Sequence, residues 1–219
     1  MDGQWERLVD PVTGSNCYII GLDGGCLIID PNSFSGIDQA MQKWNTRPTL
    51  VCLTHEHCDH IGGLNELRAR YPVLVAASAA CSLGIQDTRE NMSRRMELFL
   101  YYKSGETRRV SYPPFACRAA DLTFGTAVDL PFAGEWVRMV SLPGHTRGSS
   151  VISYRGGVFC GDYLLPGDQV LTRLPGGSEE DYRRYARPWL RAIPDGTWLF
   201  PGHGEPFQMS EKVRIAHEL

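Results

Sequence analysis

The chain has 219 residues, which is long enough for one substantial hydrophobic core or for two closely packed halves. Its net charge of −3 predicts no general attraction to nucleic acid, and no apolar run approaches the roughly 18 residues of a membrane span. The N-terminus has neither the basic stretch nor the apolar stretch of a secretory signal, so we expect a cytoplasmic protein without a nucleic-acid or membrane partner. The seven cysteines include no C-x-x-C pair and do not indicate a disulfide framework, and the oligomeric state is left open.

Hydrophobic periodicity and turn residues predict two αβ halves that follow each other without a linker. The first half is expected to contain strands at 17–21 and 26–30 around a turn at Asp23-Gly24-Gly25, a helix at 37–44, a strand at 49–54, a helix at 64–70 and a strand at 73–77. The second half is expected to contain strands at 121–124, 127–132, 136–142, 149–154 and 158–160, a helix at 179–193, a strand at 198–200 and a helix at 210–219. We therefore expect an α/β fold with two sheets face to face and helices outside.

The segment at about 82–114 is longer than an ordinary connection, which has about 4–6 residues. Met92, Met96, Phe99, Leu100 and Lys103 recur there at helical spacing, which predicts a helical insertion with an apolar stripe that ends in a cation. The insertion either packs on the sandwich or covers the functional site. In the second case Met96 and Phe99 would contact a substrate.

Five of the six histidines fall in three short polar motifs. The motifs are Thr54-His55-Glu56-His57-Cys58-Asp59-His60, Pro143-Gly144-His145-Thr146 and Pro201-Gly202-His203-Gly204. Together with Asp162 they offer seven nitrogen or oxygen ligands, whereas one catalytic zinc takes about three from the protein. Seven ligands are too many for one ion, so the set predicts a hydrolytic centre with two metal ions.

The spacing within the first motif supports this interpretation. His55 and His57 are two residues apart, so they share a face of an extended chain, and they follow an apolar stretch that reads as a buried strand. Open α/β sheets build sites where such strands end. His60 has the opposite parity, so we expect it to serve the second ion.

These residues, in this order, resemble the metallo-β-lactamase-fold hydrolases, and among them the glyoxalase II-like group. Residues 16–20 and 174–177 resemble further stretches of that group, and the resemblance spans about residues 12–206. It implies a four-layer αββα sandwich formed by a single domain over residues 1–219. It also implies one metal held by His55, His57 and His145, a second held by Asp59, His60 and His203, and a bridging role for Asp162.

The implied cofactors are two divalent metal ions per chain, with zinc expected and iron or manganese as alternatives. Metal binding lowers the pKa of water to about 7, so a metal-bridging hydroxide could attack a carbonyl without a serine or cysteine nucleophile. Asp59 could also accept the proton of that hydroxide. A Cys58 thiolate could in principle bind zinc, but we expect a side chain at this position to point away from the metals.

The expected substrate is a small acyl compound, and a thioester is the leading choice because the region after Asp162 resembles glyoxalase II-like proteins. The basic and tyrosine positions of hydroxyacylglutathione hydrolases do not match clearly there. Arg173 is a candidate to bind a substrate carboxylate, and a plain surface arginine is the alternative. A lactonase or another ester hydrolase would use the same centre. A β-lactamase, a sulfur-oxidising dioxygenase with one iron, a nuclease and a non-enzymatic binding module are less favoured.

Overall fold

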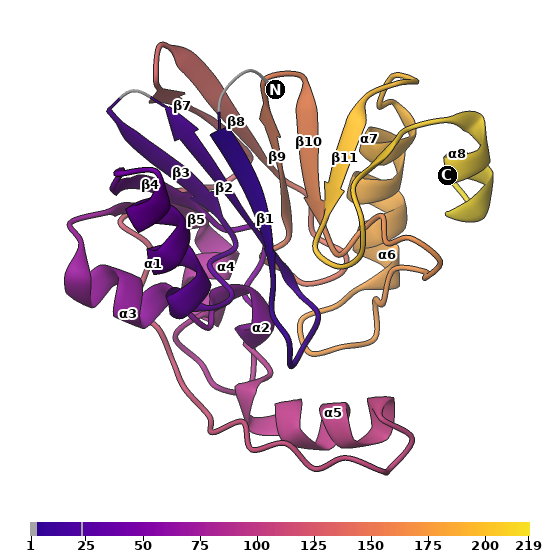
Figure 1. Cartoon of the computed structure of the whole chain (residues 1–219). Coiled ribbons are helices and arrows are strands. Elements are labelled where there is room, and N and C mark those ends of the chain that lie inside the picture. The colour runs from indigo at the N-terminus through magenta and orange to yellow at the C-terminus, as the bar shows by residue number, and fades with distance from the viewer. Residues whose placement is uncertain (1–3, 23) are drawn as a thin grey trace.

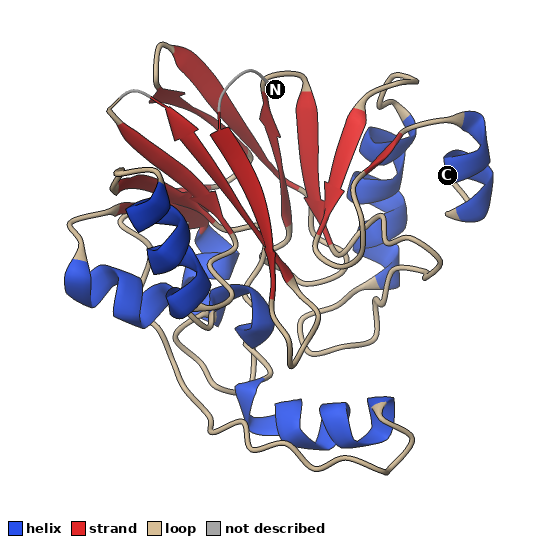
Figure 2. Ribbon diagram, viewed as in Figure 1, coloured by secondary structure: helices blue, strands red, loops and turns tan. Residues whose placement is uncertain are grey.

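The computed structural model describes residues 4–22 and 24–219, and it contains two six-stranded β-sheets that pack face to face (Figure 1). Helices lie against the outer face of each sheet, and loops and short helices gather at one end of the strands (Figure 2). Within the described residues no helix is long and apolar enough to cross a membrane.

The first sheet has the order β1-β2-β3-β4-β5-β6. Its strands are β1 Gln4–Val9, β2 Asn16–Leu22, β3 Gly25–Ile29, β4 Pro48–Cys52, β5 Leu74–Ser78 and β6 Leu122–Phe124. The pairs β1–β2 and β2–β3 are antiparallel, and the pairs from β3 to β6 are parallel. Parallel strands β3, β4 and β5 therefore end at the same edge, where the first motif begins.

The second sheet has the order β12-β11-β10-β9-β8-β7. Its strands are β7 Ala127–Phe132, β8 Glu135–Ser141, β9 Ser150–Tyr154, β10 Gly157–Gly161, β11 Trp198–Pro201 and β12 Phe207–Gln208. Only β10 and β11 pair in parallel among these described strands. The second and third motifs follow β8 and β11, and Asp162 follows β10.

Three apolar clusters separate the four layers. Successive side chains of β2 enter two different clusters. Cys17 and Ile19 face the helices, while Tyr18 and Ile20 face the other sheet. The helices are α1 Phe34–Lys43, α2 Cys58–Ile61, α3 Leu64–Arg70, α4 Ala79–Gly84, α5 Met96–Lys103, α6 Glu179–Asp181, α7 Arg187–Arg191 and α8 Glu211–Ala216. Helices α1 and α3 cover the first sheet, and α7 covers the second (Figure 1). The predicted αββα sandwich is confirmed.

Most predicted elements are present, but several boundaries and one assignment were wrong. The strand at 121–124 belongs to the first sheet, because β6 pairs in parallel with β5. The helix at 179–193 is broken by a π-helical turn over Tyr182–Ala186. Strands β1 and β12 and helices α2 and α4 were not anticipated. The predicted turn at Asp23-Gly24-Gly25 includes Asp23, which lies outside the described residues.

The segment at 82–114 contains the helical turns that its pattern predicts. A 3₁₀ turn at Ser93–Arg95 leads directly into α5, while Met92 has a φ of 67° and precedes both. Met92 therefore belongs to the apolar stripe without being helical. Figure 1 shows α5 beyond α2, at the end of the sandwich where the motif-bearing loops lie.

Candidate metal centre

All seven predicted ligands lie at one end of the sandwich, where strands from both sheets stop. His55 and His57 occupy the loop after β4, and Asp59 and His60 lie on the single turn of α2. His145, Asp162 and His203 follow β8, β10 and β11 of the second sheet. The site is therefore formed between the two sheets. Their ligand roles remain predictions.

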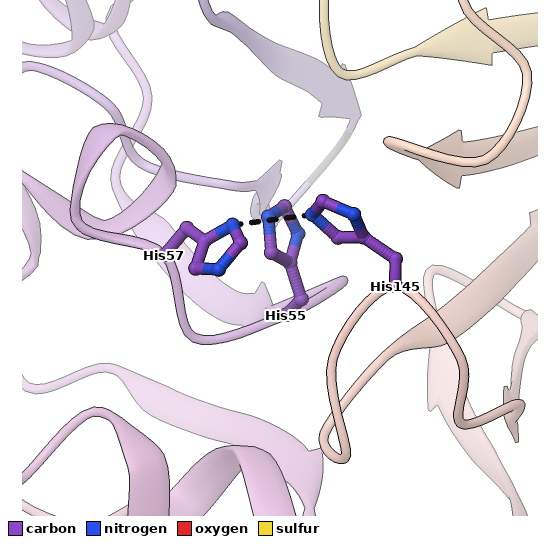
Figure 3. Close-up of side chains that lie close together, drawn as sticks. All are labelled: His55, His57 and His145. Atoms are coloured by element: carbon purple, nitrogen blue, oxygen red, sulfur yellow. Dashed lines mark hydrogen bonds between the residues drawn. The ribbon is translucent and has the colours of Figure 1, made fainter. Parts of the chain in front are cut away.

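His55, His57 and His145 form one compact set, the three-histidine group. Figure 3 shows their rings turned toward one another, with His145 Nε2 3.1 Å from His57 Nδ1. Ring centroids are 4.7 to 4.9 Å apart, and all three side chains are buried. Three imidazole nitrogens that converge in this way match the ligand set of a catalytic zinc site.

Hydrogen bonds around this group fix which nitrogen faces the centre. Thr54 donates its hydroxyl proton to Asp30 Oδ2 over 2.5 Å, so Thr54 Oγ1 can only accept from His55 Nδ1, 3.0 Å away. His145 Nδ1 donates to the Leu171 carbonyl over 2.7 Å. His55 Nε2 therefore presents an unpaired lone pair to the centre, and His145 Nε2 presents its lone pair on the side of His57 Nδ1, where a cation could replace their hydrogen bond.

Asp59, His60 and His203 form the second set, the aspartate group. Asp59 Oδ2 lies 3.7 Å from His60 Nε2 and 3.4 Å from His203 Nε2. His60 Nδ1 donates to Asp30 Oδ2 over 3.2 Å, which turns Nε2 toward the site. A carboxylate between two imidazoles offers the mixed oxygen and nitrogen donors that suit a divalent cation.

Asp162 lies between the two groups. Its Oδ1 is 3.5 Å from His60 Nε2, while its Oδ2 is 3.7 Å from His145 Nε2 and 3.6 Å from His203 Nε2. A side chain on Gly202 would collide with Asp162 Oδ1, so glycine there permits the close approach of the β11 loop. One carboxylate thus faces both groups, as a bridging ligand must.

The two groups differ in their protonation when no cation is bound. Burial lowers the pKa of His57 to about 3, and burial also lowers the pKa values of His55 and His145. Burial has the same tendency at His60, but the carboxylates of Asp59 and Asp162 outweigh it and raise its pKa to about 10. The carboxylates likewise raise the pKa of His203. A divalent cation would replace the protons that now balance these carboxylates.

Buried atoms without partners show that the residues fit metal ions. Among the described residues, His55 Nε2, His60 Nε2 and Asp162 Oδ1 are buried and have no hydrogen-bond partner. Leaving such a polar atom buried and unpaired costs about 1–3 kcal/mol. Their convergence is accounted for by cations that coordinate them, and the clusters indicate divalent metal binding.

Two supporting carboxylates were missed at the sequence level. Asp30 accepts from the Thr54 backbone N–H over 2.7 Å as well as from the Thr54 hydroxyl and His60, so its oxygens are already engaged. It therefore acts as an outer partner of both groups. Glu56 accepts from the Thr146 hydroxyl over 2.9 Å and ties the first motif to the His145 loop, and burial raises its pKa to about 7.

A cavity of about 410 Å³ opens directly onto the centre, and Met96 and Phe99 are among the residues that line it, while their contact with a substrate stays a prediction. Arg173 is exposed and is not among the residues that line the cavity, whereas Lys103 is one of them.

The Cys58 thiol points away from the predicted metal ligands, as expected, and packs in an apolar cluster with Met96. A larger hollow of about 640 Å³ lies beside Trp44, and its described lining contains neither histidine nor carboxylate.

Comparison with known proteins agrees with the fold. Residues 10–203 match the family profile of the Metallo-beta-lactamase superfamily. The chain is 27% identical over 205 residues to the probable metallo-hydrolase YqgX of Bacillus subtilis, covering 92% of this chain and 90% of the relative. It resembles the crystal structure of BLEG-1 B3 metallo-beta-lactamase, with a TM-score of 0.77, 22% identity and coverage of 98% and 97%. It also resembles TTHA1623 in a di-iron-bound form, with a TM-score of 0.66, 22% identity and coverage of 93% and 94%.

Proposed function

The chain belongs to the metallo-beta-lactamase superfamily, and on this premise we propose that it is a hydrolase with two divalent metal ions that cleaves a thioester or a related acyl ester. The observation that carries the proposal is the pair of three-residue groups with Asp162 between them. In this assignment the three-histidine group would hold one ion and the aspartate group would hold the other, and Asp162, which faces both groups, would be available to both.

When bound, two divalent cations would polarise a carbonyl and lower the pKa of water to about 7, which makes hydrolysis possible at neutral pH. Side-chain and backbone groups of the protein orient the ligands and accept the proton. Asp30 and the Leu171 carbonyl hold the histidine rings in the orientations described above. Asp59 lines the cavity, so its carboxylate is placed to accept the proton of the attacking water.

The cavity lining favours direct attack by water over a covalent intermediate. No serine or cysteine is among the described residues that line it. Two hydroxyl groups are in the lining. That of Thr13 already contacts Asp10 and Ser15, and the other is the phenol of Tyr102, a side chain that is 60% exposed. We therefore assign no side-chain nucleophile.

A thioester is the proposed substrate because the resemblance to the glyoxalase II-like group continues through residues 174–177, and Leu174, the first of these residues, lines the cavity. Zinc is the proposed metal. Iron is the competing assignment, because a structural relative is described in a di-iron-bound form. Lactones and other esters are the competing substrates, because the same centre could cleave them. A β-lactam is less favoured, although BLEG-1 is described as a B3 metallo-beta-lactamase.

The test combines elemental analysis of the purified protein with a hydrolysis screen over thioesters, esters, lactones and β-lactams. We expect two metal ions per chain, hydrolysis of thioesters, and a rate that reaches a plateau above an apparent pKa near about 7. Full activity with one ion per chain would contradict the dinuclear assignment. A trapped acyl-enzyme on a serine or cysteine would contradict the proposed attack by water.

A further inference from the structure

The cavity above the metal centre has one polar face and one apolar face. The polar face includes five of the predicted metal ligands, His57, Asp59, His145, Asp162 and His203. The apolar face is supplied by the segment around α5 and by the loop after Asp162, and it consists of Met92, Met96, Phe99, Leu100, Tyr102, Leu165, Leu171 and Leu174. A substrate that reaches the metals must therefore lie against these apolar side chains.

Several of these apolar side chains are not buried by the protein itself. Phe99 is 37% exposed and Leu171 is 51% exposed, although both line the cavity. Met96 and Leu100, on the same helix, are almost fully buried. Exposed apolar side chains that gather in a concave site commonly mark a ligand surface. Phe99 and Leu171 lie in separate segments of the chain, so an apolar group bound there would be covered by both.

The apolar face contacts the segment 57–59, which carries two predicted metal ligands. Cys58, between His57 and Asp59, donates its backbone N–H to the Asn91 carbonyl over 2.8 Å and accepts from the Tyr112 hydroxyl over 3.2 Å. Its thiol packs against Met96 in the same cluster. These contacts hold the base of α5 at a fixed position relative to the metal centre, as a specificity-determining wall requires.

Outside the predicted metal centre, the charged residues of the cavity lining do not favour one sign of substrate. Lys103 lines the cavity beside the Phe99 ring, and Asp168 lines it as well, so a cation and an anion are both present. The cavity volume of about 410 Å³ lies toward the small end of ligand pockets, which span about 300–1,000 Å³. Apolar surface and compact size are therefore the features that can select a substrate.

Building on the proposed hydrolase, we infer that the cavity selects substrates whose acyl chain is apolar and that Phe99 and Leu171 are specificity-determining residues. Hydrolysis of such a thioester breaks the bond between carbon and sulfur, adds water, and yields a thiol and a carboxylate. The carboxylate suits the divalent cations. Its chain would lie along the apolar face of the cavity, while the thiol would leave with the proton from water.

The test compares Phe99→Ala with Leu98→Ala in the metal-loaded protein. Leu98 is the neighbouring residue of α5, is 56% exposed and does not line the cavity, so it is a matched control for effects on the helix. Thioesters with one constant leaving thiol and acyl chains from acetyl to octanoyl are the substrates. Metal content and melting temperature are measured for each variant, so that a general loss of structure is recognised.

We expect kcat/KM of the parent protein to rise with acyl length. We expect Phe99→Ala to lower kcat/KM for octanoyl substrates about tenfold more than for acetyl substrates. Leu98→Ala should leave this ratio unchanged. Equal effects of both variants on all chain lengths would overturn the inference. A dependence on the length of the leaving thiol instead of the acyl chain would overturn it as well.

A second measurement separates this inference from the proposed function. Calorimetric titration of the metal-loaded protein with acetate, butanoate, hexanoate and octanoate should show affinity that rises with chain length, and Phe99→Ala should flatten that rise. If no thioester or ester is hydrolysed but carboxylate affinity rises with chain length, the inference of apolar selection is supported and the hydrolase assignment fails. If hydrolysis is present and carboxylate affinity is independent of chain length, the hydrolase stands and the apolar selection fails.

Discussion

The three-histidine group and the aspartate group lie side by side, yet they differ in charge and in access to solvent. The three-histidine group is buried, and burial keeps its rings neutral. The aspartate group contains a carboxylate, and its His203 side chain is 23% exposed toward the cavity. The first group is thus a neutral set of lone pairs, whereas the second carries charge that a cation must balance.

The difference shows how one site can contain two unlike metal positions. A neutral, enclosed set of imidazoles binds a cation without first losing protons. A set that contains a carboxylate attracts a cation more strongly through charge, but protons compete with that cation because the nearby carboxylates raise the pKa values of His60 and His203 against the effect of burial. Asp162 and Asp30 connect the two groups, so variants at these positions test how far the groups are independent.

The largest expected effect follows from Asp162→Ala, which removes the carboxylate that faces both groups. We expect occupancy of both metal positions to fall and kcat/KM to decrease by more than the roughly 10–100-fold that an outer hydrogen-bond partner contributes. Elemental analysis and steady-state kinetics are the measurements. Asp168→Ala is the control, because it also removes a carboxylate from the cavity lining. Full metal content in Asp162→Ala would show that the carboxylate does not bridge.

Asp30→Ala should come next, with metal affinity about 10–100-fold lower at both positions. Asp30 orients His60 directly and orients His55 through the Thr54 hydroxyl. Thr54→Val removes only the link to His55, so it should weaken the three-histidine position alone. Competition titrations with a metal chelator measure both affinities. Equal effects of the two variants on both positions would contradict this division.

A smaller, graded effect is expected from pH. The carboxylates raise the pKa of His60 to about 10 against the effect of burial, so protons compete with the metal at the aspartate group below that pH. Burial lowers the pKa values of the three-histidine group, so protons compete less with a metal ion there. As the pH falls from about 8 to about 6, the ion in the aspartate group should be lost first. Elemental analysis after dialysis at each pH checks this order, and loss of both ions together would contradict it.

The gathering of the seven candidate ligands could be predicted from the sequence because they stand in short motifs that follow strands. The two outer carboxylates could not be found in this way, because their partners are distant in the chain. Asp30 and Thr54 are 24 positions apart, and Glu56 and Thr146 are 90 apart. Only the packing of β3 beside β4, and of the His145 loop against the first motif, brings these residues together.

The fold, too, could be predicted from the sequence only where the evidence is local to one segment. Strands such as β2 and β7 were predictable because their residues alternate between two environments or stand between clear turn residues. Strand β1 shows no such alternation, since it is an edge strand that is exposed or half-buried throughout. The sheet to which β6 belongs depends on its parallel pairing with β5, across the segment that contains α4 and α5. Local periodicity carries no information about such a pairing.

The smallest effect is expected from Cys58→Ala, although Cys58 lies between two predicted ligands. The thiol is fully buried in the cluster with Met92, Met96 and Leu100, and it therefore faces away from both metal-binding groups. Burial also raises the pKa of the thiol, which disfavours the thiolate that a metal would bind. Its removal should leave metal content unchanged and lower the free energy of unfolding by about 1 kcal/mol through lost packing. Cys117→Ala is the matched control, because Cys117 is a buried thiol in the core between the first sheet and its helices. Elemental analysis and denaturant unfolding compare the two variants, and an emptied metal position in Cys58→Ala alone would show that the thiol is a ligand.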